Sequence, residues 1–175
     1  MLRIVCLLLV ASWTSAADTP ELKVVAGKAL PKTCTLEFVA PAGKQNIAIL
    51  DLTKPVKLPH AGPYDVIVNA KGQLPIRILT KWKPVAELKL SDHVGTVFVR
   101  GDEFPRAERI VITSGDDAGP GEKGHKPIQS ASDYKQDMVV LPGVYTVWVV
   151  PANGARAQKI AEKIRVLAGR ETRVE

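Results

Sequence analysis

Cysteine is scarce in this sequence, and its two cysteines do not indicate a disulfide. Cys6 lies in an N-terminal segment that we expect to be removed, which leaves Cys34 without an intramolecular partner. Cys34 alternates with Leu36 and Phe38, so the three side chains share one face of a predicted strand. We interpret Cys34 as a small buried residue rather than a nucleophile, because buried thiols are generally inert.

Long apolar runs are also lacking. The apolar run at residues 4–11 is far shorter than the roughly 20 residues that a membrane-spanning helix needs. Arg3 precedes this run and small residues follow it at 15–17, an order that is typical of a secretory signal peptide. We therefore predict a signal peptide at residues 1–17, export to the periplasm or the extracellular space, and no stable membrane insertion after cleavage.

Reactive side chains are few, and the common catalytic motifs are missing. The sequence has three histidines and no Gly-x-Ser-x-Gly, HExxH, CxxC or phosphate-binding glycine loop. Asp116, Asp117, Glu122 and His125 form a polar cluster whose spacing matches no metal-ligand pattern, and we interpret it as a solvated loop. We predict a protein that is not an enzyme, without catalytic residues, cofactor or metal. The alternative is a small secreted hydrolase that uses His125.

Positive charge is in modest excess, with a formal net charge of +6. Basic and acidic residues are interspersed except at residues 155–175, where basic residues outnumber acidic ones. We interpret this segment as a solvated charged face. An exported protein rarely meets nucleic acid, so we expect no nucleic-acid partner and consider an extracellular protein or a polysaccharide instead.

Short runs rich in Val, Ile, Leu and Thr are what the sequence does contain. They alternate with Pro and Gly at spacings of about ten residues, which is typical of an all-β sandwich. The pattern predicts six strands in each half of the mature chain. These strands lie near residues 33–39, 46–52, 55–58, 64–70, 74–80 and 85–90, and then near 94–100, 108–113, 137–141, 145–150, 160–167 and 172–175.

Three segments recur in the same order, which indicates an internal duplication. In the best match, Tyr64 is aligned with Tyr145. The matched segments are residues 35–39 with 96–100, 58–68 with 141–149, and 76–79 with 164–167. We predict one β-sandwich repeat at residues 18–92 and a second at 93–175, the second with a polar insertion loop at 114–136.

Both copies of the best match contain Leu-Pro, a turn with Gly, and then Tyr-x-Val-x-Val. We expect each tyrosine to bury its ring and to return its hydroxyl to nearby backbone, as in the tyrosine corner of Greek-key sandwiches.

This turn and strand resemble those of carboxypeptidase regulatory-like and collagen-adhesin B-type repeats. The resemblance implies an all-β chain of two tandem small immunoglobulin-like (prealbumin-like) sandwiches. It also implies a spacer, stalk or binding module. The lysine–asparagine crosslink of adhesin repeats is not expected, because no acid stands at the corresponding place.

Aromatic and apolar residues that point away from the predicted cores are the candidate binding residues. If Tyr145 faces the core, Trp148 faces outward, and we expect Leu167 to do the same. Outward apolar side chains are either covered by another part of the protein or bind a ligand, and we expect the other repeat to cover them. The candidate ligand-binding residues are Trp148, Leu167 and Trp82. The predicted function is a non-catalytic exported structural or binding module, and the alternative is carbohydrate binding on exposed aromatic residues.

Removal of residues 1–17 defines the start of the exported protein. Cleavage after Ala16 or Ala17 gives a chain that begins at Ala17 or Asp18. We expect N-terminal sequencing and the intact mass of protein from the exported fraction to show one of these two starts. Exported protein that still begins at Met1 would contradict the prediction.

Overall fold

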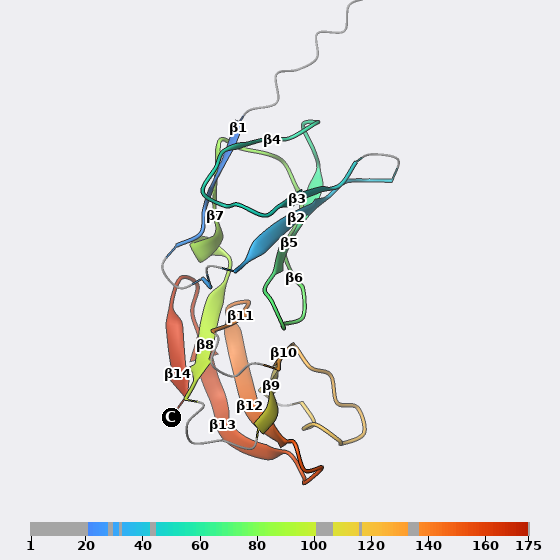
Figure 1. The fold of residues 1–175 in the computed structure, drawn as a ribbon, viewed down its shortest axis with the longest axis vertical. Helices are drawn as coiled ribbons and strands as arrows, with labels where there is room; N and C mark the ends of the chain where they lie inside the picture. Colours follow the sequence, from blue (N-terminus) through green and yellow to red (C-terminus); the bar gives the residue numbers. More distant parts are fainter. Residues whose placement is uncertain are drawn as a thin grey trace, which may run out of the picture.

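A computed structural model describes residues 21–27, 30–31, 33–42, 45–100, 107–115, 117–132 and 137–174. The predicted signal peptide at 1–17 lies outside these residues. The described chain is all-β and forms two tandem β-sandwich units, as the sequence predicts (Figure 1). We call the unit of strands β1–β7 repeat 1 and the unit of strands β8–β14 repeat 2.

Repeat 1 packs a three-stranded sheet of order β4-β1-β7 on a four-stranded sheet of order β3-β2-β5-β6. Alternate side chains point between the sheets, as Leu36 and Phe38 of β2 do, and form the core of repeat 1. The strands are β1 (Glu21–Val25), β2 (Thr35–Val39), β3 (Ile47–Ile49), β4 (Val56–Lys57), β5 (Tyr64–Asn69), β6 (Ile76–Trp82) and β7 (Glu87–Lys89).

A single turn of 3-10 helix, η1 (Leu90–Asp92), leads into repeat 2. Repeat 2 packs a sheet of order β11-β8-β14 on a sheet of order β10-β9-β12-β13. Its strands are β8 (Gly95–Val99), β9 (Ala107–Ser114), β10 (Gln129–Ala131), β11 (Met138–Val140), β12 (Gly143–Pro151), β13 (Gln158–Val166) and β14 (Glu171–Val174).

The two repeats share one topology. In each repeat the first strand pairs in parallel with the last strand and antiparallel with the fourth, and the other four strands pair in the same order. Each of the twelve predicted strands has a counterpart in the structure, and two further strands, β1 and β10, were not predicted. β10 reads QSA and has none of the Val, Ile, Leu or Thr on which the prediction relied, whereas β1 reads ELKVV and was missed although it contains three of them.

The tyrosine alignment holds in the structure, whereas the two flanking alignments are wrong. Because β1 was missed, residues 35–39, which form β2, were matched to β8; the strand of repeat 2 that corresponds to β2 is β9. Tyr64 lies opposite Trp82, and Tyr145 lies opposite Ile164. Trp82 rather than Ile76 is therefore the counterpart of Ile164.

Both tyrosines adopt the predicted corner. Tyr64 and Tyr145 are buried, and their hydroxyls donate to the carbonyl oxygens of His60 at 3.1 Å and Leu141 at 2.7 Å. Each acceptor lies four residues before its tyrosine, so the bond ties the turn to the strand that follows it. Burial raises the pKa of both tyrosines.

A β-bulge follows each tyrosine at the same position. At this first register shift, one extra residue on β6 lies opposite β5, and one extra residue on β13 lies opposite β12; a second shift follows directly in both pairs. Lys81 and Lys163 stand at the two bulges with φ angles of 52° and 54°, and they are the non-glycine residues with positive φ in the described part of the chain. A side chain rarely adopts this conformation. Its recurrence at equivalent positions supports the duplication.

Two glutamines join the repeats, and we call their interaction the glutamine clasp. Gln129 of β10 is 0% exposed, and its Oε1 accepts the Leu74 N–H at 2.7 Å while its Nε2 donates to the Leu74 carbonyl oxygen at 3.1 Å. Gln73 reaches in the opposite direction: its Nε2 donates to the Asp137 carbonyl oxygen at 2.8 Å, and its Oε1 accepts the Val139 N–H at 2.9 Å. Each side-chain amide therefore bonds to backbone of the other repeat as a neighbouring strand would.

The two cores also meet beside the clasp. Met138 and Val140 of β11 face the core of repeat 2, whereas Val139 between them belongs to the core of repeat 1 and is 1% exposed. An isolated antiparallel bridge joins Gln73 to Ala131 at the same place. Figure 1 shows the turn between β5 and β6 directed at β10 and β11.

The linker between the repeats is packed on both sides. Ser91 of η1 lies between Gly27 of repeat 1 and Gly169 of repeat 2, which have φ angles of 81° and 67°. A methyl group on Gly27 would lie 3.0 Å from the Ser91 Cβ, and one on Gly169 would lie 3.1 Å from the Ser91 carbonyl oxygen. The Gly169 N–H also donates to the Val94 carbonyl oxygen at 2.8 Å. The linker and the clasp are thus two separate contacts between the repeats.

Replacing Gln129 by Met tests the clasp, because it keeps most of the side-chain volume and removes the hydrogen bonds. A buried backbone group left without a partner costs roughly 1–3 kcal/mol, and Leu74 and Val139 would both lose partners. We expect the wild type to unfold in urea in one transition. The free energy of unfolding of Gln129→Met should be lower by about 2–4 kcal/mol. The exposed Gln158 on β13 provides the control, because Gln158→Met should change stability by less than about 0.5 kcal/mol. Equal stability of the two variants would contradict the role of the clasp.

Candidate functional site

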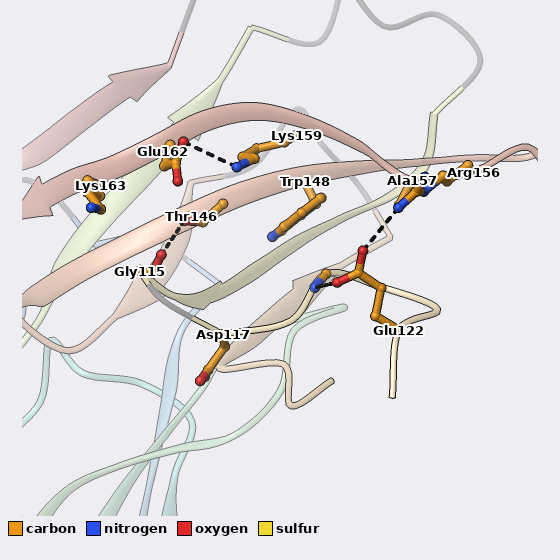
Figure 2. Close-up of a pocket in the computed structure, with 11 residues that line it drawn as sticks. Gly115, Asp117, Glu122, Thr146, Trp148, Arg156, Ala157, Lys159, Glu162 and Lys163 are labelled. Atoms are coloured by element: carbon orange, nitrogen blue, oxygen red, sulfur yellow. Dashed lines mark hydrogen bonds and ion pairs between the residues drawn. The ribbon is translucent and has the colours of Figure 1, made fainter. Parts of the chain in front are cut away.

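A groove of about 680 Å³ lies on the outer face of the four-stranded sheet of repeat 2, and we call it the repeat 2 groove. Thr146 and Trp148 of β12 line it, with Lys159 and Lys163 of β13 on one side (Figure 2). On the other side runs the segment of residues 115–128 between β9 and β10, which we call the insertion segment. The volume falls in the range of about 300–1,000 Å³ that is usual for ligand pockets.

The insertion segment is what distinguishes repeat 2 from repeat 1. In repeat 1, β2 and β3 are separated only by residues 40–46. The segment is held at its start because the Gly115 N–H donates to the Val144 carbonyl oxygen and the Thr146 hydroxyl donates to the Gly115 carbonyl oxygen, both at 3.1 Å. The predicted loop at 114–136 is not loop throughout, since it contains β10 and the buried Gln129.

Glu122 fastens the insertion segment to the hairpin between β12 and β13. Its carboxylate accepts the Gly119 N–H at 2.9 Å and pairs with the Arg156 guanidinium at 3.2 Å (Figure 2). The Gly119 N–H and, after it, Arg156 lower the pKa of Glu122, so the carboxylate is ionised at neutral pH. This pair closes one end of the repeat 2 groove.

The remaining charges of the groove are not fully matched. Lys159 pairs with Glu162 at 3.2 Å. Lys163 is exposed, and its ammonium has no ion pair or hydrogen bond among the described residues. Figure 2 shows the Asp117 carboxylate directed away from Trp148. Asp117 nevertheless lines the groove, so among the described residues the groove has one cation, Lys163, and one carboxylate, Asp117, without an ion pair.

Trp148 is half-buried, and the insertion segment rather than the other repeat covers it. Its indole N–H donates to the Thr113 Oγ1 at 3.1 Å, and the Lys159 ammonium lies 5.7 Å from the ring centroid. A methyl group on Gly119 would lie only 2.6 Å from the indole, so the backbone of the insertion segment touches the ring. The prediction that repeat 1 covers Trp148 is wrong. The same contacts restrict the ring surface on which a sugar could stack.

The other two candidate binding residues lie elsewhere. Trp82 is half-buried and packs on the core of repeat 1, where its ring centroid is 5.8 Å from that of Phe38. Leu167 follows β13 and is 49% exposed, so repeat 1 does not bury it as expected. Trp148 is therefore the one candidate that lines the repeat 2 groove. Lys163 was not among the candidate residues predicted from the sequence. A correct alignment of Lys163 with Lys81 would have indicated its position at the equivalent bulge.

Among the described acidic residues of the loop that contains His125, none forms a hydrogen bond or an ion pair with the His125 ring. The His125 Nδ1 lies 3.2 Å from the Ala118 carbonyl oxygen, and Glu122 is engaged by Gly119 and Arg156. Asp116 lies outside the described residues. Across the part of the chain that the structure describes, no three His, Cys, Asp or Glu side chains are grouped closely enough to share a metal ion. The described geometry thus offers no support for the hydrolase alternative.

Comparison with known proteins yields no relative: no family model, no curated protein and no solved structure matches the chain. Within the described ranges, no helix has the length and apolar character needed to cross a membrane.

Cys34 is 3% exposed, and burial raises its pKa from 9.0 to about 11. The thiol is therefore covered and protonated at neutral pH, and we expect iodoacetamide to modify Cys34 far more slowly in the native protein than in urea. Peptide mapping separates Cys34 from Cys6. Equal rates in both conditions would contradict the buried position.

The same pKa shift predicts a loss of stability at alkaline pH. Below pH 9 the thiol is protonated in both states, and between pH 9 and 11 the unfolded chain releases the proton while the native protein retains it. The contribution of Cys34 to the free energy of unfolding is therefore complete below pH 9 and falls as the pH rises towards 11. In Cys34→Ala, urea unfolding should show a smaller decline over this interval. If the stability of Cys34→Ala declines as much as that of the wild type, groups other than Cys34 cause the decline.

Proposed function

We propose that the mature chain is a non-catalytic exported module, in which two immunoglobulin-like (prealbumin-like) sandwiches act as one rigid structural or binding unit. The glutamine clasp is the observation that carries this proposal. Domains joined only by a linker are expected to move relative to one another. Here the clasp and the packed linker hold the repeats at two separate places.

The class of module is supported by the shared topology and by the two tyrosine corners. Both features agree with the resemblance to carboxypeptidase regulatory-like and collagen-adhesin B-type repeats, which are mostly spacers, stalks and binding modules. The signal-peptide pattern at residues 1–17 supports export. A rigid body of two repeats suits a protein that holds a binding surface at a fixed distance and orientation.

Binding is the second candidate function, and the repeat 2 groove favours it. The groove has the size of a ligand pocket, and one side of it is formed by the insertion segment, which is longer than the corresponding segment of repeat 1. Its polar lining and the covered ring of Trp148 favour recognition by charge over the stacking of sugars on aromatic rings.

Rigidity is measured by ¹⁵N relaxation of the full mature chain. We expect the backbone amides of both repeats to report one common rotational diffusion tensor. In the variant Gln73→Ala/Gln129→Ala, the two repeats should reorient with separate, shorter correlation times. The dispersion of the amide signals shows whether both repeats of this variant remain folded. Independent tumbling of the repeats in the wild type would contradict the proposal.

A further inference from the structure

The two repeats differ in the outer face of the four-stranded sheet. In repeat 1, the outward side chains of the two central strands are all partly exposed, and they are Glu37, Val39, Asp65 and Ile67. By strand register, their counterparts in repeat 2 are, in the same order, Val111, Thr113, Thr146 and Trp148, which we call the covered strip. The first three residues of the covered strip are at most 2% exposed, because the insertion segment lies over them.

The insertion segment covers this strip with few buried contacts of its own. Gly119 is the one buried residue in the range 117–128, and its backbone lies against the six-membered ring of the Trp148 indole. Further along, a methyl group added to Gly121 or Gly124 would meet no atom within 4 Å. The segment therefore buries no large apolar side chain on the sheet.

The polar contacts of the segment with the sheet are concentrated at its two ends. Gly115 holds the near end, and at the far end the Ile128 N–H donates to the Ile112 carbonyl oxygen at 2.8 Å. For residues 118–127, the one polar contact with other described parts of the chain is the Glu122–Arg156 pair. Both side chains of this pair are exposed, and exposed ion pairs contribute little to stability.

A segment that is fixed at its ends and weakly held between them opens more easily than the core. Regions with few buried apolar contacts open locally at a lower free energy than global unfolding requires. The covered strip itself belongs to β9 and β12, which pair along their length and carry the core of repeat 2 on their other face. Opening of the insertion segment therefore leaves the sandwich intact.

We propose that the insertion segment is a lid that opens from the sheet while both repeats stay folded. In the closed position its backbone covers part of the Trp148 ring, which is the one aromatic ring that lines the repeat 2 groove (Figure 2). Opening uncovers the strip, so access to this ring depends on the position of the lid. This inference goes beyond the rigid module, which does not depend on a lid.

The test is hydrogen exchange of the Trp148 indole N–H, which donates to the Thr113 Oγ1 within the covered strip. Exchange is followed by NMR on the full mature chain at several urea concentrations below the unfolding transition, with the Val147 amide as the reporter of global unfolding. We expect the indole N–H to exchange faster than the Val147 amide and at a rate independent of urea, because local opening exposes little surface. A rate that rises with urea as steeply as that of Val147 would overturn the proposal.

The variant Gly119→Ala tests whether the lid causes this exchange. The φ angle of Gly119 is not positive, so the backbone accepts a side chain, but the added methyl group would lie 2.6 Å from the indole in the closed position. We expect exchange of the indole N–H to be about tenfold faster than in the wild type and still independent of urea. The control is Lys123→Ala at an exposed position of the same segment, which should leave the rate unchanged.

Equal exchange of the indole N–H in Gly119→Ala and the wild type would show that another motion exposes the ring, and would overturn the lid. The urea dependence in the wild type stands without either variant. A failure here leaves the relaxation measurement of rigidity unaffected.

Discussion

The structure depends on a buried amide that is satisfied only when the two repeats are correctly aligned. Gln129 makes four hydrogen bonds through its side chain, two to Leu74 of repeat 1 and two within repeat 2. A buried amide without partners is costly, so a displaced repeat 1 would leave this group and the Leu74 backbone unpaired. The hydrogen bonds of Gln129 therefore select one relative position of the repeats, in addition to whatever stability they contribute.

The fixed position of the repeats links stability to the proposed binding surface. Each repeat is of a size at which a lone core is marginal, and Val139 extends the core of repeat 1 with a side chain from repeat 2. β10, which carries Gln129, directly follows the insertion segment that forms one side of the groove. The contact with repeat 1 and the wall of the groove are therefore adjacent in the chain.

The sequence predicted the repeated local features well. Periodic apolar runs identified twelve strands, and the pattern around Tyr64 and Tyr145 predicted the buried rings and their hydrogen bonds. These features depend on residues close together in the chain. The missed strand β1 displaced the alignment before the tyrosine match, since β2 was paired with the first strand of repeat 2. The alignment after the match was wrong for another reason, because Ile76 was matched with Ile164, whose counterpart is Trp82.

The contacts between distant residues could not be predicted in the same way. Gln73 bonds to residues 64 and 66 positions away, and neither it nor Gln129 stands in an apolar or periodic pattern. A glutamine in a polar segment is ordinarily exposed, so its burial depends on a partner that the local sequence does not reveal. The contact of the insertion segment with Trp148 was not predicted either. This segment is polar, so it was interpreted as a solvated loop, and the local sequence does not reveal that it packs on the ring.

Native-state hydrogen exchange at two amides tests the central claim most directly. The N–H groups of Leu74 and Val139 donate to the glutamine side chains of the opposite repeat. If the repeats form one cooperative body, both amides should exchange only through global unfolding, with the same protection as core amides such as Val66 and Val147. Exchange of Leu74 and Val139 that is orders of magnitude faster than that of the core amides would show that the repeats separate while each remains folded, and would contradict the account.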